Sequence, residues 1–148
     1  MAGPGDAELL WETFRTSRPE SYEMLPENLL RMQHRAREAA YSASYPGAEN
    51  CVIVTAGRPV GRVLVWWSDD ECRVVDLAIL PAERGRGLGE LVVRSLADEA
   101  KRAGKPLRAS VASDNPGALR LYQRVGFNVV SNEGATLALE LAPPKTLG

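Results

Sequence analysis

The stretch Leu77-Ala-Ile-Leu-Pro-Ala-Glu-Arg-Gly-Arg-Gly-Leu-Gly-Glu90 decides how this chain is interpreted. Apolar residues typical of a buried strand are followed by alternating glycines at positions 85 to 89, and then by residues with helical spacing. Glycine lets the backbone turn tightly and approach a ligand, and a helix N-terminus presents free N–H groups and a positive dipole. With Arg84 and Arg86 beside it, this junction predicts a site for a phosphate-bearing ligand, although the glycines alone could equally form a tight turn.

Two familiar nucleotide motifs do not fit this junction. A Walker A loop needs GxxxxGK[ST], and no Lys-Ser or Lys-Thr follows the glycines. The dinucleotide fingerprint GxGxxG needs a glycine at its sixth position, where the sequence has Glu90 counted from Gly85 and Val92 counted from Gly87. A P-loop-like nucleotide hydrolase is therefore poorly supported.

Upstream of the junction the pattern predicts two helices and then three strands. The helices cover residues 6–17, with Asp6 as N-cap, and Pro26 to Ser44, and the strands cover Cys51–Thr55, Val60–Trp67 and Cys72–Leu80. Turn residues at 56–59 and 68–71 separate the strands, so we expect an antiparallel meander.

The start of the chain leaves two alternatives open. Only five residues rich in Gly and Pro precede Asp6, too few for a good strand. Either a first strand is missing, or Leu10 to Thr16 is that strand and not a helix; the spacing of Leu10 and Phe14 favours the helix. A missing strand would leave a sheet edge that a second copy of the chain could cover, as a homodimer.

Downstream of the junction, helices and strands alternate. The expected elements are a helix from Leu88 to Ala103 closed by Gly104, a strand Leu107–Ala112, a helix opened by Asn115 and Pro116 that ends at Val125, and a hairpin of Phe127–Ser131 and Thr136–Leu141. The predicted fold class is α+β, with a mixed, mostly antiparallel central sheet, one β-α-β crossover and flanking helices. No linker, repeat or low-complexity tract divides the sequence, so we predict one domain over residues 1–148.

Composition excludes several classes of protein. Lys plus Arg number 18 and Asp plus Glu 19, a formal net charge of −1, which gives no reason to expect a nucleic-acid partner. No apolar run is long enough to span a membrane and no secretory leader opens the chain, so we expect no membrane partner and a cytoplasmic location. His34, Cys51 and Cys72 are the only residues of their types, and their spacing fits neither a metal site nor a Ser-His-Asp or Cys-His hydrolase.

Three motifs in a fixed order give the chain a family resemblance. Arg84-Gly85-Arg86-Gly87-Leu88-Gly89 fits the pattern [Arg or Gln]-x-x-Gly-x-[Gly or Ala]. One helix and one strand later follow Asn115-Pro-Gly-Ala-Leu-Arg-Leu-Tyr122 and Arg124-Val-Gly-Phe127. From about Val60 to Phe127 the chain resembles the GNAT superfamily of acyl-CoA-dependent N-acyltransferases. The segment before about Cys51 carries no comparable signature.

The resemblance implies acetyl-CoA as co-substrate and assigns residues to it. The loop from Arg84 to Gly89, with the backbone of Glu90, would hold the pyrophosphate. Leu77 and Ile79 would pair with the pantetheine arm through main-chain hydrogen bonds. A splay between their strand and residues 107–112 would admit that arm.

Two further residues receive roles from the resemblance. Asn115 would hydrogen-bond the cofactor beyond the splay, and Tyr122 would be the general acid that reprotonates the leaving thiolate of CoA. Each also has a purely structural interpretation. Asn115 before Pro116 is a good N-cap without any cofactor, and Tyr122 shares an apolar helix face with Leu121 and Val125.

The general base is not evident from the sequence. Many members of the family carry a glutamate five residues before the asparagine, where this chain has Ser110. Asp76 and Glu71 are candidates, as is a chain of water molecules, although Asp76 could equally brace the sheet. His34 could also reach the acceptor from the N-terminal helices.

The expected function is transfer of an acetyl group from acetyl-CoA to a primary amine by direct attack in a ternary complex, without a metal or a covalent nucleophile. The amine could belong to a small molecule, a peptide N-terminus or a lysine. A backbone N–H near Ile79 would stabilise the oxyanion. A non-catalytic acyl-CoA-binding or regulatory module on the same fold is the alternative, which Ser110 in place of an acid keeps open.

Overall fold

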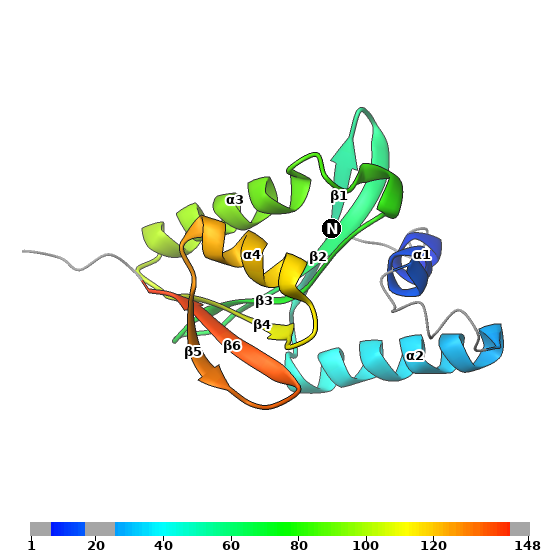
Figure 1. Cartoon of the computed structure of the whole chain (residues 1–148), viewed down its shortest axis with the longest axis horizontal. Coiled ribbons are helices and arrows are strands. Elements are labelled where there is room, and N and C mark those ends of the chain that lie inside the picture. Colours follow the sequence, from blue (N-terminus) through cyan, green and yellow to red (C-terminus); the bar gives the residue numbers. More distant parts are fainter. Residues whose placement is uncertain (1–6, 17–25, 143–148) are drawn as a thin grey trace, which may run out of the picture. The chain divides into compact units, whose positions relative to one another are not determined.

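The computed structural model describes residues 7–16 and 26–142 (Figure 1). The helices are α1 (Ala7–Thr16), α2 (Glu27–Ser44), the short 3₁₀ helix η3 (Pro81–Glu83), α3 (Leu88–Arg102) and α4 (Pro116–Val125). The strands are β1 (Glu49–Thr55), β2 (Arg58–Trp67), β3 (Cys72–Ile79), β4 (Leu107–Ala112), β5 (Asn128–Asn132) and β6 (Thr136–Leu141). The predicted helices and strands occur in the predicted order, and their ends differ by at most two residues. The expected N-cap Asp6 lies outside the described residues.

The strands follow the order β1-β2-β3-β4-β6-β5. Strand β1 is antiparallel to β2, and β6 is antiparallel to both β4 and β5. Strands β3 and β4 are parallel, and their pairing runs only from Cys72–Leu107 to Val74–Ala109, although β3 continues to Ile79. Pairing that ends this early is what the expected splay requires. The mixed, mostly antiparallel sheet confirms the predicted fold class.

The turn between β1 and β2 is shorter than the predicted turn at 56–59. Thr55 pairs directly with Arg58, so only Ala56 and Gly57 connect the strands. Both have a positive φ, 52° and 76°, as in the type I′ turns that match the twist of a two-residue hairpin. The predicted hairpin is confirmed, but its turn is two residues shorter, because the ladder includes Arg58 and accommodates Pro59 next to an irregularity in the register.

The described residues form two compact units. The first contains residues 7–16, 26–66 and 76–86, and the second contains residues 67–75 and 87–142. Strand β3 contributes to both of them, so the boundary does not coincide with a linker. One acyltransferase domain over residues 1–148 stays a prediction. In the part of the chain that the structure describes, no helix has the length and apolar character needed to cross a bilayer.

The core of the first unit contains the helix that was predicted around Leu10 and Phe14. Trp11 and Phe14 of α1 are buried with Leu30 of α2. The His34 ring lies 5.9 Å from the Trp11 ring and 5.1 Å from the Phe14 ring. The alternative that Leu10 to Thr16 forms a strand is therefore wrong, and in residues 7–16 and 26–142 no strand precedes β1. Helix α1 gains its stability from this apolar contact with α2.

The second unit is built on β4 and β6 and on the helices α3 and α4. Leu107 of β4 and Leu139 of β6 are almost fully buried, as is Val93 of α3. Helix α4 ends at Gly126, whose φ of 119° allows its N–H to close the last turn. The next residue, Phe127, is buried against Tyr122 with 5.1 Å between ring centroids. This contact fixes the C-terminal half of α4.

Candidate functional site

The glycine loop takes the conformation that its sequence predicts. Gly85 and Gly87 have φ values of 80° and 77°, in the left-handed region that favours glycine. A Cβ at either position would meet no atom within 4 Å, so conformation and not crowding requires glycine there. Gly89 differs, because it is buried in the first turn of α3. The loop therefore uses two glycines to turn and one to pack.

The start of α3 presents backbone donors that no side chain in residues 7–16 and 26–142 satisfies. Its N-cap is Gly87, which has no side chain and makes no capping hydrogen bond. The intrahelical ladder begins with the N–H of Leu91, which donates to the carbonyl of Gly87 at 3.0 Å. The N–H groups of Leu88, Gly89 and Glu90 precede it and lie at the positive end of the helix dipole. These donors can bind an anion.

The Glu90 side chain does not compete for those donors. Its two carboxylate oxygens accept from Arg124 at 2.8 Å and from Arg94 at 3.2 Å. These hydrogen bonds, that of Arg124 first, lower the pKa of Glu90, so its carboxylate remains charged and paired. Only the backbone of Glu90 is then available to a ligand, as the resemblance implies.

Arg84 connects the loop to the end of β3. Its Nε donates to the carbonyl of Ile79 at 3.0 Å, and its Nη2 donates to the carbonyl of Thr16 at 3.3 Å. The Ile79 carbonyl keeps a second lone pair, so main-chain pairing with a ligand at this strand end is still possible. Gly61 of β2 permits the close approach of β3, because a Cβ there would collide with the carbonyl of Ala78.

Glu83 is a functional-site neighbour that the sequence interpretation missed. It is 5% exposed, and its carboxylate accepts from Arg86 at 3.2 Å and pairs with Arg58 at 3.4 Å. A buried carboxylate needs such partners, because desolvation otherwise disfavours its charge. The sequence signal that could have identified Glu83 is its position directly before Arg84-Gly-Arg-Gly87. Arg86 is thus held by Glu83, with its side chain still largely exposed.

Asn115 is a helix cap in the structure. Its Oδ1 accepts from the N–H of Ala118 at 3.1 Å, and the side chain is exposed. Capping uses the oxygen, whereas the amide group also carries two N–H donors. The structural interpretation is thus confirmed. A hydrogen bond from the amide nitrogen to a cofactor stays a prediction.

Tyr122 lies in the interior of the second unit. It is 6% exposed and its ring makes an edge contact with Phe127. Helix spacing and burial agree with the core role that its apolar neighbours suggested. Its role as general acid stays a prediction, and the buried ring gives the hydroxyl a fixed position from which to act.

Asp76 is held by arginines on the face of the sheet in the first unit. Its Oδ2 accepts from Arg62 Nε at 2.9 Å, and Arg37 lies 3.7 Å from its Oδ1. Arg62 also donates from Nη1 and Nη2 to the two oxygens of Glu38, both at 2.7 Å. We call these four residues the Arg62 network. Asp76 thus has the contacts of a bracing residue, and its role as base stays a prediction.

The charges of the Arg62 network interact strongly, because the arginine at its centre is buried. The Arg62 side chain is only 4% exposed. Burial by itself would lower the pKa of Arg62, but the hydrogen bonds and charges of Glu38 and Asp76 outweigh it and raise that pKa above its ordinary value. Burial and the charge of Asp76 raise the pKa of Tyr41. Arg62 was not identified from the sequence, because nothing local distinguishes an arginine that is buried on a strand.

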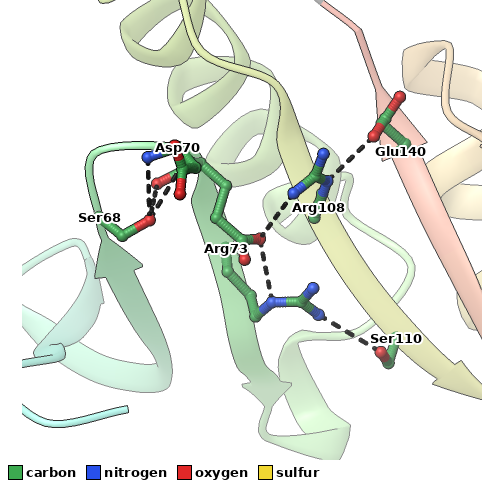
Figure 2. A network of polar contacts seen from close by, with 7 residues as sticks. Ser68, Asp70, Arg73, Arg108, Ser110 and Glu140 are labelled. Atoms are coloured by element: carbon green, nitrogen blue, oxygen red, sulfur yellow. Dashed lines mark hydrogen bonds and ion pairs between the residues drawn. The ribbon is translucent and has the colours of Figure 1, made fainter.

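Glu71 lies in a second set of charges, in the second unit (Figure 2). Arg73 donates to its Oε2 at 3.1 Å, and Arg108 lies 3.9 Å from the same oxygen. Arg108 also donates to Glu140 at 2.9 Å, and Arg73 contacts the Ser110 hydroxyl at 3.5 Å. We call these residues the Glu71 network. Ser110, which replaces the expected acid, therefore lies beside an arginine.

His34 belongs to the aromatic core of α1 and α2. Its Nδ1 is buried and has no hydrogen-bond partner among the described residues. Burial lowers the pKa of His34, so the ring is neutral near pH 7. A neutral ring between Trp11 and Phe14 is a packing residue. Its proposed approach to an acceptor is not supported by these contacts.

The expected site residues thus fall into two sets. Asp76, Leu77, Ile79 and the loop residues 84–86 belong to the first unit. Residues 87–90, Asn115 and Tyr122 belong to the second unit. The two sets are joined covalently between Arg86 and Gly87.

Comparison with known proteins supports the family. A model of the acetyltransferase (GNAT) family matches residues 7–127. The L-methionine sulfoximine/L-methionine sulfone acetyltransferase of Salmonella typhimurium is 40% identical over 52 residues, which cover 34% of this chain and 30% of that protein. The L-2,4-diaminobutyric acid acetyltransferase of Nocardia farcinica is 28% identical over 125 residues, which cover 82% of this chain and 59% of that protein. The matched regions span less than two thirds of these relatives.

The fold is also found among solved structures. The PaiA N-acetyltransferase of Thermoplasma acidophilum, in complex with coenzyme A, superimposes with a TM-score of 0.72. The match covers 92% of each chain at 18% identity, so it shows a common fold. Because the family match includes the glycine loop, Asn115 and Tyr122, and extends over residues 7–127 of 148, the chain belongs to the GNAT acetyltransferase family.

Proposed function

We propose that this protein is an acetyl-CoA-dependent N-acetyltransferase that acts on a primary amine. The observation that carries the proposal is the start of α3. Three N–H groups there follow two glycines of positive φ and have no side-chain cap among the described residues. Open space surrounds both glycines, so the residues present fit the pyrophosphate of an acyl-CoA. Arg84 and Arg86 add positive charge to the same loop.

The remaining cofactor contacts follow the order of the chain. Main-chain groups of Leu77 and Ile79, at the end of β3 beyond its pairing with β4, would bind the pantetheine arm. The Asn115 amide nitrogen would donate to the cofactor while its oxygen caps α4. Bound acetyl-CoA supplies the acetyl group as a thioester. No covalent intermediate with the protein is needed.

The residues of the chain supply proton transfer and charge stabilisation. As the C–N bond of the amide forms and the C–S bond of the thioester breaks, a backbone N–H near Ile79 would stabilise the oxyanion. The Tyr122 hydroxyl would donate a proton to the sulfur. The amine must lose a proton, which Asp76 or a water chain would accept.

The names of the relatives suggest a class of acceptor. The two relatives are named for L-methionine sulfoximine, L-methionine sulfone and L-2,4-diaminobutyric acid, all of which are small. We therefore propose a small-molecule amine as acceptor, ahead of a peptide N-terminus or a lysine. A panel of amines in an assay that detects the CoA thiol distinguishes these classes.

Calorimetry with acetyl-CoA and turnover of the Tyr122→Phe variant test the proposal together. The wild type should bind acetyl-CoA and release CoA when an amine is added. Tyr122→Phe should lower kcat by roughly 100-fold, the lower end of general acid catalysis, with acetyl-CoA affinity nearly unchanged. An unchanged kcat would remove Tyr122 from this role. No binding of acetyl-CoA at millimolar concentration would overturn the proposal.

One set of observations favours a second candidate, a non-catalytic acyl-CoA-binding module. Ser110 replaces the expected acid, and both other acids, Asp76 and Glu71, are paired with arginines. Such a module would bind acetyl-CoA as tightly as an enzyme would. It would release no CoA with any amine, so the same assay separates the two candidates.

A further inference from the structure

Two arginines from different elements of the first unit meet at one buried carboxylate. Glu83 of η3 pairs through Oε1 with Arg58 Nη2 at 3.4 Å, and its Oε2 accepts from Arg86 Nη1 at 3.2 Å. Arg58 opens β2, whereas Arg86 follows Gly85 in the glycine loop. We call Arg58, Glu83 and Arg86 the Glu83 cluster. It brings a residue of the β1–β2 hairpin to the loop that is expected to bind the cofactor.

Main-chain hydrogen bonds hold the two sides of the cluster together. Arg58 pairs with Thr55 directly after the two-residue turn of the hairpin. The N–H of Leu80 donates to the carbonyl of Val60 at 2.8 Å, and the N–H of Glu83 donates to the carbonyl of Leu80 at 2.9 Å. These bonds join η3 to β2 two residues after Arg58. The approach of Glu83 to Arg58 therefore rests on the backbone as well as on the two side chains.

The acid of the cluster is buried and its arginines are exposed. The Glu83 side chain is 6% exposed, whereas those of Arg58 and Arg86 are 63% and 61% exposed. Each guanidinium carries five N–H donors, and Arg58 approaches Glu83 with Nη2 and Arg86 with Nη1. Both arginines therefore keep donors for a ligand that approaches from solvent.

The charges of the cluster favour an anion as that ligand. Its two arginines and one carboxylate leave one positive charge, and Arg84 of the same loop adds another. Arg84 donates to two main-chain carbonyls, which do not cancel its charge. Guanidinium groups match the oxygens of a phosphate in geometry as well as in charge.

The acid has a physical reason to lie beside such a site. The guanidinium groups of Arg58 and Arg86 would repel each other if nothing negative lay between them. One oxygen of the Glu83 carboxylate contacts each of them, so the pair is oriented before a ligand arrives. Side chains that are already ordered lose less entropy on binding, which increases affinity.

Open space adjoins both arginines. A Cβ added at Gly85, directly before Arg86, would meet no atom within 4 Å. The same holds for Gly57, directly before Arg58 in the hairpin turn. The backbone on this side of each arginine is therefore open to a ligand.

We propose that Arg58 and Arg86 together bind one phosphate group of the acyl-CoA, and that Glu83 positions both arginines for it. The inference rests on the proposed acetyltransferase function and deepens it, because Arg58 and Glu83 lie outside the three sequence motifs. Coenzyme A carries phosphate at two places, in its pyrophosphate and at the 3′ position of its ribose. Arg58 is then a cofactor-binding residue and Glu83 a positioning residue.

Four variants and a control test the cluster. Arg58→Gln and Arg58→Lys change an exposed side chain, so the fold should persist. Arg35→Gln is the matched control, because Arg35 is also exposed in the first unit and lies outside the Glu83 cluster. Glu83→Gln keeps the shape of the buried side chain and removes its charge. The fourth variant combines Arg58→Gln with Glu83→Gln, and circular dichroism checks that all five proteins fold.

The measurements on Arg58 are the calorimetric Kd of acetyl-CoA, its KM, and kcat at saturating acetyl-CoA. Arg58→Gln should raise the Kd and the KM about tenfold, as expected for a lost hydrogen bond to a charged group. Its kcat should change less than twofold, because the lost contact contributes equally before and during the reaction. Arg58→Lys should recover part of the affinity, since it keeps the charge and loses the planar donor group. Arg35→Gln should resemble the wild type.

The double variant tests the positioning role of Glu83. Glu83→Gln should raise the Kd of acetyl-CoA about fivefold in the wild type, through the loss of ordered arginines. Added to Arg58→Gln, it should raise the Kd less than twofold further, because the cluster then contains no second arginine that repels the first. A residue with a merely structural role would give losses that multiply.

Acetyl-3′-dephospho-CoA identifies the phosphate that is bound. If the arginines bind the 3′-phosphate, the wild type and Arg58→Gln should bind this analogue with equal affinity. If they bind the pyrophosphate, Arg58→Gln should lose the same factor of about ten with the analogue as with acetyl-CoA. Either result supports the inference.

Other results would overturn it. An acetyl-CoA Kd of Arg58→Gln within twofold of the wild type excludes the binding role, and it leaves the proposed function standing if the wild type releases CoA with an amine. Tighter binding by Glu83→Gln, or losses that multiply, exclude the positioning role. A wild type that binds acetyl-CoA but releases no CoA with any amine overturns the proposed function alone, because the Kd values still test the cluster. A wild type that does not bind acetyl-CoA overturns both.

Discussion

The Arg62 network and the Glu71 network contain the same chemical groups in different surroundings. Each has arginines between two carboxylates, and each includes a candidate base, Asp76 or Glu71. The Arg62 side chain is 4% exposed, whereas that of Arg108 is 37% exposed. Burial decides how much each network contributes to the free energy of unfolding. Water and salt screen an exposed ion pair, whereas a buried charge depends on its partners.

The largest expected effect is that of Arg62→Met on stability. The substitution leaves Glu38 and Asp76 without their main partner, which should cost about 3 kcal/mol of unfolding free energy. Urea denaturation followed by circular dichroism measures the loss. A loss below about 1 kcal/mol, in the range of an exposed pair, would remove the distinction between the two networks.

The next comparison concerns the two candidate bases. If Asp76 accepts the proton of the amine, Asp76→Asn should lower kcat/KM by about 10- to 100-fold and flatten its dependence on pH. Glu71→Gln, the matched change in the other network, should alter kcat/KM less than twofold. Steady-state kinetics over a pH series measures both. Parallel losses with unchanged pH profiles would assign Asp76 a bracing role only.

A smaller effect is expected for Arg108→Gln. The pairs of Arg108 with Glu140 and Glu71 are partly exposed, so their loss should cost at most about 1 kcal/mol. The difference from the wild type should shrink in 1 M salt, where exposed charges are screened. Urea denaturation at low and high salt checks this. A loss of unfolding free energy as large as that of Arg62→Met would show that the two networks do not differ in energy because of their exposure.

The smallest effect concerns His34, beside the Arg62 network. Its folded pKa is lowered by burial below the unfolded value of about 6.5. At a pH between the folded pKa and about 6.5, the unfolded chain therefore binds more protons than the folded chain. The stability that His34 contributes is present above pH 6.5 and is lost as the pH falls through the folded pKa. His34→Gln should remove this part of the slope of stability between pH 7 and 5. An identical slope in the variant would contradict the assignment.

The sequence predicted most of the fold because the relevant signals are local. Helix spacing around Leu10 and Phe14 identified α1, and the glycines and Asn115 marked the starts of α3 and α4. The turn at Ala56–Gly57 was less predictable, because Ala56 takes a positive φ that its residue type does not favour. The candidate cofactor loop was identified for the same local reason, since glycine conformation and helix ends depend on neighbouring residues.

The Arg62 network could not be found in this way. Arg62 meets Glu38 and Asp76 across separations of 24 and 14 residues, and no local pattern encodes those pairings. By itself, then, the sequence determined the order of the elements and the glycine loop, through local backbone preferences. Only the tertiary structure decided which charges are buried together, because such burial arises when distant segments exclude water from one another.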